Sequence, residues 1–408
     1  MERSGTNRLG IILLVLAQGV SVTGDMVLLT AASIAVFRAT DSATSVSLLL
    51  GLAAVPTVVL GPFGGTFADW FPRRRILVGA DLIATVACLV ALGISEISST
   101  TVTAFLAVVS VASLGAFYRP AAQALLPSLA TNDQIGRANS ALRLATGLAS
   151  ILGPALAAFM VERGGLDFVL AADAGTFLVS AGLVLFIRHV PPRVAAGGRR
   201  SAFRDAWAGL DYAGKNPRIR TVTAAIGVVM LVGTLVNTGT LPLVSRTLDL
   251  PESRYGTLLA IEGGGAMALA IIFLTLGPGK RLLVTGAFAL VGTGGTTLAL
   301  GSAQGFGVAA GAILLQGASV VGLQVAFSSY LQQEAEDAFR GRVMSLVGMV
   351  ASFAQLVGYA VAGPVIEWLG PRTSFVIAGS AVCVVAIPVV AIAFAAARAE
   401  RAQVAATT

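Results

Sequence analysis

The chain has 408 residues, of which 56% are hydrophobic and 12% are charged, and its formal net charge is +7. A soluble domain usually has about a quarter charged residues, so this composition excludes an ordinary soluble protein. The basic excess would suit a nucleic-acid partner only if it lay on a water-facing domain, and we find no such domain in the sequence.

Hydrophobic stretches of about 20 residues recur along nearly the whole chain, and each is long enough to cross a hydrocarbon layer. The first begins near Leu9 and has no small-residue cleavage site at its end, so we expect it to remain as the first helix. Cys88 and Cys383 fall inside predicted helices, which favours packing residues over a disulfide or a metal site. The sequence therefore predicts an all-α membrane protein with twelve transmembrane helices, at residues 9–36, 46–68, 76–96, 101–128, 137–161, 167–189, 219–245, 255–277, 281–301, 304–332, 341–368 and 372–398.

The basic residues are distributed unevenly over the predicted loops. If the N-terminus is cytoplasmic, 21 of the 27 Lys and Arg residues lie on that side, five lie on the other, and Arg119 lies within the fourth helix. Basic loops stay on the cytoplasmic side of a membrane, where anionic lipids attract them. We therefore expect a multi-pass protein of a bacterial inner membrane with both termini in the cytoplasm.

The two halves of the chain match when the numbering is shifted by 205 positions. A duplication of this kind predicts two pseudo-symmetric six-helix halves, with a substrate site between them near the middle of the membrane. Six identities fall between residues 136 and 165: Gly136 on Gly341, Arg137 on Arg342, Ser140 on Ser345, Gly153 on Gly358, Glu162 on Glu367 and Gly165 on Gly370.

A polar segment separates the halves. We assign residues 1–189 to an N-terminal six-helix bundle, 190–218 to a cytoplasmic linker, and 219–408 to a C-terminal six-helix bundle. Within the linker, apolar residues recur at helical spacing among charged ones, which is typical of an amphipathic helix on the membrane surface. These residues are Phe203, Trp207 and Leu210.

Residues 65–75 read Gly-Thr-Phe-Ala-Asp-Trp-Phe-Pro-Arg-Arg-Arg. Together with the twelve helices, the duplication and the central linker, this segment resembles the signature loop of the major facilitator superfamily. Other segments are similar to its drug and siderophore exporter branch, which includes enterobactin exporters and macrolide efflux proteins. They are Gly24-Asp25, Tyr118-Arg119-Pro120-Ala121, Leu125-Leu126-Pro127, Arg137-Ala138-Asn139-Ser140 and Gly153-Pro154.

Three positions depart from the family pattern. Pro72 stands where the signature loop normally has glycine, and Ala157-Ala158 replaces the glycine pair that closes the helix-five motif of Gly153 and Pro154. Val111 replaces an arginine that many antiporters carry in helix four and that is tied to proton coupling in related exporters. The resemblance therefore implies the fold more strongly than it implies proton antiport.

The resemblance also implies a conformational latch at the cytoplasmic surface. In the family, the signature loop stabilises the outward-facing state, and here its residues would be Gly65, Asp69, Arg73 and Arg74. An acid near a neighbouring helix N-terminus and a basic partner can make such a contact. A basic cluster that only sets the topology would explain the arginines but not Asp69, four residues after Gly65.

Ionisable groups inside hydrocarbon are costly and therefore mark functional candidates. Asp25 and Glu262 lie about 4 and 6 Å to the outer side of the middle of their helices, and a desolvated carboxyl there can take up and release protons. We predict both as proton-coupling residues. Asp25 could instead hold the halves together, and the three glycines after Glu262 suggest close helix packing or a flexible break.

The remaining candidates concern a substrate cavity. In the superfamily fold, helices one, four, five and eight border this cavity, and Arg119 and Arg143 could bind an anionic group there or merely neutralise the acids. Neutral polar residues could hydrogen-bond a substrate or tie helices together. These are Gln18, Gln123, Asn237, Gln324 and Gln355.

The leading hypothesis is secondary active efflux of a small amphipathic compound, such as a drug, an antibiotic or a siderophore, coupled to protons. The two halves would alternate their access around one site, in a chain that works as a monomer. No nucleotide loop, metal spacing or nucleophile motif is found, so we expect neither an enzyme nor a cofactor. The expected partners are a small-molecule substrate, protons and the lipid bilayer, and no nucleic acid. A facilitator or importer of a metabolite or lipid, and a non-transporting membrane receptor, remain as alternatives.

Overall fold

The computed structural model describes residues 8–131, 133–188, 210–279, 281–337 and 339–407, except for the side chains of Pro62, Asp69 and residues 399–407. All the elements in these ranges are helices. They divide into two compact units, with residues 1–197 and 251–260 in unit 1 and residues 198–250 and 261–408 in unit 2. The predicted domain bounds remain a prediction, and Phe203 and Trp207 of the predicted linker helix lie outside the described residues.

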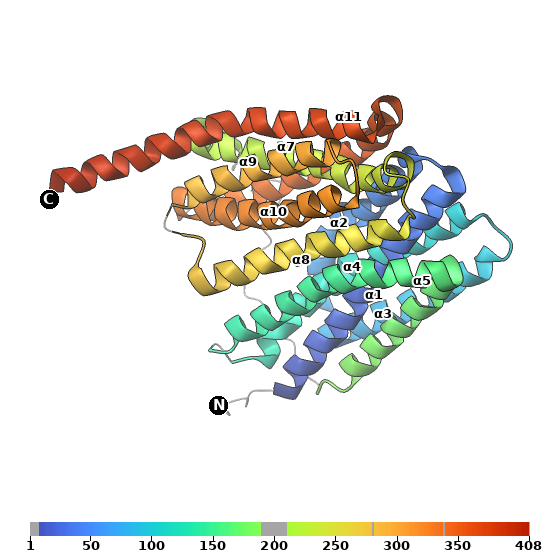
Figure 1. Cartoon of the computed structure of the whole chain (residues 1–408). Coiled ribbons are helices and arrows are strands. Elements are labelled where there is room, and N and C mark those ends of the chain that lie inside the picture. Colours follow the sequence, from blue (N-terminus) through green and yellow to red (C-terminus); the bar gives the residue numbers. More distant parts are fainter. Residues whose placement is uncertain (1–7, 132, 189–209, 280, 338, 408) are drawn as a thin grey trace, which may run out of the picture. The chain divides into compact units, whose positions relative to one another are not determined.

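The helices follow the predicted apolar stretches closely (Figure 1). At their ends, most extend a few residues beyond the predicted bounds, because polar residues continue the helix into the membrane surface. They are α1 Arg8–Thr40, α2 Ala43–Trp70, α3 Arg73–Ser95, α4 Thr100–Leu129, α5 Ile135–Leu185, α7 Pro217–Pro242, the π-helical turn η1 Leu243–Thr247, α8 Ser253–Leu276, α9 Leu282–Gly301, α10 Phe306–Glu334 and α11 Arg340–Thr407.

Two of these helices each contain two of the predicted spans. Gly165 in α5 has φ 64° and Gly370 in α11 has φ 76°, and both break the helical geometry. Glycine adopts this left-handed conformation without the penalty that a Cβ atom brings. Among the described residues, ten helices are long and apolar enough to cross a membrane. With the two breaks they provide the twelve spans that the sequence predicts.

The two units also repeat a close helix contact. A Cβ atom on Gly153 of α5 would overlap Met26 of α1, and one on Gly358 of α11 would overlap Thr234 of α7. Gly153 and Gly358 are 205 positions apart in the sequence, as are Gly165 and Gly370. The equivalent positions thus make equivalent contacts, which confirms the fold of two pseudo-symmetric six-helix halves.

Helix α3 shows why the fold belongs in a membrane. Its buried face carries Asp81, Thr85 and Cys88, whereas Ile83 and Val86 on the opposite face are each 58% exposed. A helix in water buries its apolar face and exposes its polar face. The reversed arrangement suits hydrocarbon, where polar groups must find partners inside the protein.

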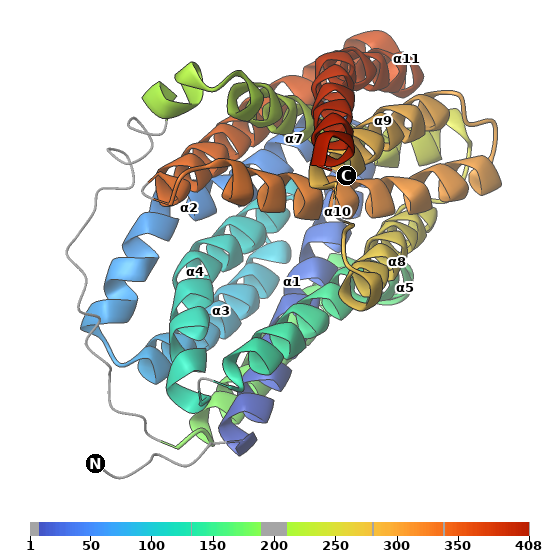
Figure 2. The same cartoon turned by 90° about the vertical axis from the view of Figure 1, so that its left-hand side faces the viewer.

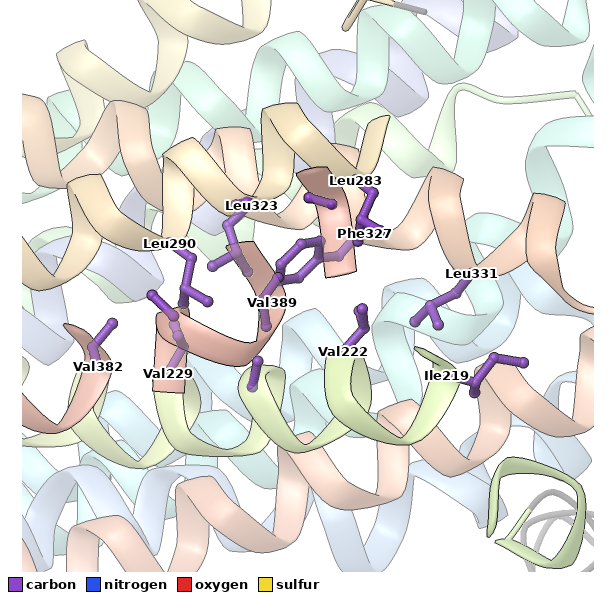
Figure 3. Packing of buried hydrophobic residues seen from close by; sticks show 14 of the residues in the cluster. Ile219, Val222, Val229, Leu283, Leu290, Leu323, Phe327, Leu331, Val382 and Val389 are labelled. Carbon is purple, nitrogen blue, oxygen red and sulfur yellow. The ribbon is translucent and has the colours of Figure 1, made fainter. Parts of the chain in front are cut away.

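Unit 2 has a dense apolar core around Phe327 of α10. The ring has no exposed surface and lies among Leu283, Leu323 and Val389 (Figure 3). It also lies against Gly286 of α9, where a Cβ atom would overlap the ring. Small residues that let helices approach closely are a common basis of packing in membranes, where water does not drive helices together.

Candidate functional site

A small cavity inside unit 1 is lined by Asp25 of α1 and by groups from α3, α4 and α5. Helices α4 and α5 pack against α1, and α3 packs against both of them (Figure 2). The centre of a water molecule can occupy about 20 Å³ of this cavity, which is room for about one ordered water. Asp25, Asp81, Tyr118 and Arg119 provide its polar lining. Val111, at the position of the family arginine, contributes an apolar wall.

Asp25 has incomplete hydrogen bonding in this cavity. Its Oδ1 atom is buried and has no hydrogen-bond partner within the described part of the chain. Arg119 provides an attractive charge, although the arginine side chain is itself largely exposed. A buried carboxylate oxygen without a donor is costly, and the charge of Arg119 offsets part of that cost.

Asp81 is a second acid on this cavity, and it was not among the predicted site residues. The residue is 1% exposed, and the Ser180 hydroxyl donates a hydrogen bond of 2.7 Å to its Oδ2 atom. The Ser180 oxygen lies 3.3 Å from the Tyr118 hydroxyl. Asp81 therefore belongs to a polar chain that joins α3, α4 and the second segment of α5.

Asp173, in the second segment of α5, is a third buried acid that was missed. Thr176 donates a hydrogen bond of 3.0 Å to its Oδ1 atom, and the Cys88 thiol lies 3.8 Å from its Oδ2 atom. Helix α1 approaches at Gly24, where a Cβ atom would overlap both Asp173 and Thr176.

A sequence signal for both of these acids does exist. Asp81, Thr85 and Cys88 recur at spacings of four and three residues in an otherwise apolar helix, which places them on one face. Asp173, Thr176 and Ser180 recur at spacings of three and four residues and form a second polar stripe in α5. Depth in the membrane does not single out Asp81 or Asp173, because each lies near the start of its predicted helix.

Glu262, the other predicted proton-coupling residue, is half-buried in α8 within unit 2. Its backbone carbonyl would overlap a Cβ atom on Gly317 of α10, and the Leu314 carbonyl would overlap one on Gly265. Of the glycines after Glu262, Gly265 therefore serves close packing of α8 on α10, which was one of the two alternatives, whereas a Cβ atom on Gly264 would have nothing within 4 Å. The structure does not bring Glu262 and Asp25 into one unit.

The neutral polar candidates have different environments. In unit 2, the Asn237 amide donates a hydrogen bond of 3.4 Å to the Tyr359 hydroxyl, which also bonds to Gln355. The Asn237 bond therefore ties α7 to α11, whereas Gln355 and Tyr359 lie in the same helix. In unit 1, Gln18 is 6% exposed, and its Oε1 atom has no hydrogen-bond partner among the described residues. Gln123 and Gln324 are exposed, and so is the charged candidate Arg143.

The predicted signature loop is mostly helical. Gly65 and the backbone of Asp69 lie in α2, and only Phe71 and Pro72 separate α2 from α3. Phe71 is extended, with φ −113° and ψ 152°, as expected of a residue before proline. The side chain of Asp69 lies outside the description, so the latch remains a prediction.

The two latch arginines bind helix ends in their own unit. Arg73 donates hydrogen bonds of 2.7 Å to the Ala124 carbonyl and 3.0 Å to the Ser128 hydroxyl near the end of α4. Arg74 donates to the carbonyls of Val184 and Leu185 at the end of α5. Basic groups at helix C-termini satisfy unpaired carbonyls and complement the helix dipole.

The helix-five motif also mediates packing within unit 1. Besides the contact of Gly153 with α1, the Pro154 carbonyl would overlap a Cβ atom on Gly256. Residues 251–260 belong to the same unit as Pro154, so Gly256 allows the start of α8 to lie directly on α5. The alanines that replace the usual glycine pair, Ala157 and Ala158, are both buried.

Comparison with known proteins gives consistent relatives over nearly the whole chain. The chain is 25% identical over 393 residues to the uncharacterized MFS-type transporter YfiS of Bacillus subtilis, which covers 91% of this chain and 90% of that protein. It is 24% identical to macrolide efflux protein A of Streptococcus pyogenes, with 91% and 92% covered. It is also 24% identical to the multidrug efflux pump Tap of Mycolicibacterium fortuitum, with 91% and 93% covered.

Solved structures resemble the fold at lower identity. A mutant form of the nucleoside transporter NupG has a TM-score of 0.74 at 13% identity, with 94% of this chain and 99% of that chain covered. A bacterial homologue of the iron transporter ferroportin, in the inward-facing state, has a TM-score of 0.68 at 16% identity, with 93% and 98% covered. The family model of the Major Facilitator Superfamily matches residues 14–344. The chain therefore belongs to the major facilitator superfamily and is a multi-pass membrane transporter.

Proposed function

We propose that this transporter exports a small amphipathic compound, such as a drug, an antibiotic or a siderophore, in exchange for protons. The observation that carries the proposal is the Asp25 carboxyl, which lines a cavity beside Arg119 and has a buried oxygen without a hydrogen-bond donor. Relatives named for macrolide efflux and multidrug efflux support the direction and the substrate class.

The chemistry of Asp25 suits an exchange of substrate for a proton. In the protonated state the carboxyl is neutral, and Arg119 is free to attract an anionic group. In the deprotonated state the carboxylate pairs with Arg119 or with a cationic substrate, so a proton and a cation compete for one group. Such competition links substrate binding to proton release on the cytoplasmic side, and proton binding to substrate release on the other side.

The other predicted residues have supporting roles in this proposal. Glu262 is a second proton-coupling candidate in unit 2, and Arg143 is a further charge that a substrate can contact. Alternating access would follow from movement of one six-helix half against the other around the site. The signature segment would stabilise one of the two states through Gly65 and Asp69.

The proposal includes a location and an orientation. We infer a bacterial inner membrane with both termini in the cytoplasm, because the basic residues concentrate on one side of the predicted topology. The chain would act as a monomer and without a cofactor, so the bilayer, protons and the substrate are its only required partners.

Growth and efflux assays test the substrate class. A bacterial host without its own drug exporters would express the chain and be exposed to erythromycin, ethidium or enterobactin. We expect the wild type to raise the tolerated concentration of at least one of them and to lower its accumulation in cells. Asp25→Asn should lose both effects, whereas Asp133→Asn, on an exposed loop between α4 and α5, should keep them.

Two results would contradict export. Higher accumulation of a compound in expressing cells would favour an importer or facilitator. Binding of a compound to the purified protein, with no flux in proteoliposomes, would favour a receptor. Equal amounts of each variant in the membrane, measured by immunoblot, are needed for the comparison.

A further inference from the structure

The proposed function uses Asp25 but gives no role to Asp81 and Asp173. Both are 1% exposed, and both interact electrostatically with Asp25. The three acids come from three different helices, α1, α3 and the second segment of α5. Three carboxyl groups in the interior of one six-helix unit require an explanation beyond packing.

The charges around these acids do not balance. The ionisable groups that the packed helices bring to the cluster are Asp25 from α1, Asp81 and Cys88 from α3, Tyr118 and Arg119 from α4, and Asp173 from α5. Within this described set, Arg119 is the one cation. Carboxylates that share a site shielded from water cannot all be ionised at once. At least one proton therefore remains in the cluster.

The hydrogen bonds differ among the three acids. Asp81 accepts a bond from Ser180, and Asp173 accepts one from Thr176. Both carboxylates therefore have a donor that stabilises their charged form, whereas the buried Oδ1 atom of Asp25 has none. This makes Asp25 the group that depends most on a proton or on Arg119.

The cavity provides a path between two of the acids. Asp25 and Asp81 line the same space, which has room for about one water molecule. A proton can leave the Asp25 carboxyl, pass through such a water and bind the Asp81 carboxylate. One O–H bond breaks as another forms at each transfer, and the total charge of the cluster does not change.

We propose that Asp25, Asp81 and Asp173 bind the proton of the transport cycle as one coupled set, in which the charge state of each acid controls the others. The inference rests on the proposed function, because that proposal makes the proton the coupling ion. The coupled set itself, however, can be measured without any substrate. Asp81 and Asp173 share the proton with Asp25, and their charge states set when Asp25 gives it up.

Infrared difference spectroscopy tests the set directly. The purified transporter in lipid bilayers would be titrated from roughly pH 5 to pH 9 while the C=O band of protonated carboxyl groups is recorded. We expect Asp81→Asn and Asp173→Asn each to remove part of the signal. Each should also move the midpoint of the remaining signal by about one pH unit to lower pH, because a neighbouring negative charge is lost.

Asp133→Asn is the matched control, since it makes the same substitution at a carboxyl that is exposed to water. The side chain of Thr131 hydrogen-bonds to Asp133 and lowers the pKa of that carboxyl, so its titration falls below the range measured. Ser180→Ala is a further test that keeps all three acids. Loss of the donor to Asp81 should move the midpoint to higher pH.

The coupled set would be overturned if the titration midpoints of Asp81→Asn and Asp173→Asn were equal to the midpoint of the wild type. If either variant does not fold, an unchanged midpoint in Ser180→Ala overturns it equally. A separate arm records ethidium efflux and proton movement in proteoliposomes. Shifted midpoints together with efflux that moves no protons support the coupled set and overturn proton coupling as the proposed function.

Discussion

The close approach of α8 and α10 predicts opposite effects on stability for substitutions at two neighbouring glycines. Gly264 and Gly265 are neighbours in α8, but only Gly265 lies against the α10 backbone, where a Cβ atom would overlap the Leu314 carbonyl. A Cβ atom on Gly264 would have nothing within 4 Å. Gly265→Ala and Gly264→Ala therefore add the same methyl group, one into a packed contact and one into open space.

The difference in stability between the two variants can be estimated from the packing. Overpacking a contact between two backbones costs about 1–3 kcal/mol, because α8 and α10 must separate. An alanine in an open helical position instead gains up to roughly 1 kcal/mol over glycine. A loss of about 2 kcal/mol in Gly265→Ala corresponds to a decrease in Tm of roughly 4–8 °C in a domain of this size.

Thermal unfolding followed by circular dichroism in detergent micelles measures this difference, because the signal includes unit 2, which contains both glycines. We expect Gly265→Ala to unfold several degrees below the wild type and Gly264→Ala to unfold at the same temperature or higher. Equal midpoints for the two variants would refute the close packing of α8 on α10.

Two further expectations concern topology and the site. Ile97 and Leu276 are 86% and 81% exposed, and they lie at the ends of helices that finish on opposite sides in the predicted topology. In intact cells, a membrane-impermeant maleimide should label Ile97→Cys but not Leu276→Cys, and the opposite result would invert the topology. Gly24→Ala should lower the free energy of unfolding by about 1–3 kcal/mol, because its methyl group overlaps Asp173. Gly175→Ala, where a Cβ atom has nothing within 4 Å, is the control in a denaturant titration, and equal stability of the two would contradict the contact.

The spans of the fold could be predicted from the sequence because hydrocarbon demands about 20 apolar residues in each helix. The breaks at Gly165 and Gly370 fall in the gaps between predicted helices, at 162–166 and 369–371, so the apolar stretches predicted where the two longest helices divide. The helix ends near Phe71 and Pro72 were less predictable. Polar residues there continue α2 and α3 beyond the apolar stretch, and apolarity alone cannot locate such ends.

The site was only partly predictable, for a physical reason. Asp25 and Arg119 were identified because a charge inside an apolar stretch is conspicuous. Which charges meet depends on the rotation of each helix about its axis, and a helix that is apolar nearly all round contains little information about rotation. The contacts of Asp81 with Ser180 and of Asp173 with Cys88 therefore became visible only in three dimensions.

Proton movement in proteoliposomes tests most directly whether Asp25 couples transport to protons. An outward gradient of ethidium, with a pH-sensitive dye in the lumen, should drive protons inward as ethidium leaves wild-type proteoliposomes. Asp25→Asn should move no protons, and an unchanged thermal unfolding midpoint together with an equal amount of protein in the proteoliposomes shows that the variant folds. Proton movement of wild-type size in Asp25→Asn, or wild-type efflux of ethidium without any proton movement, would contradict the account.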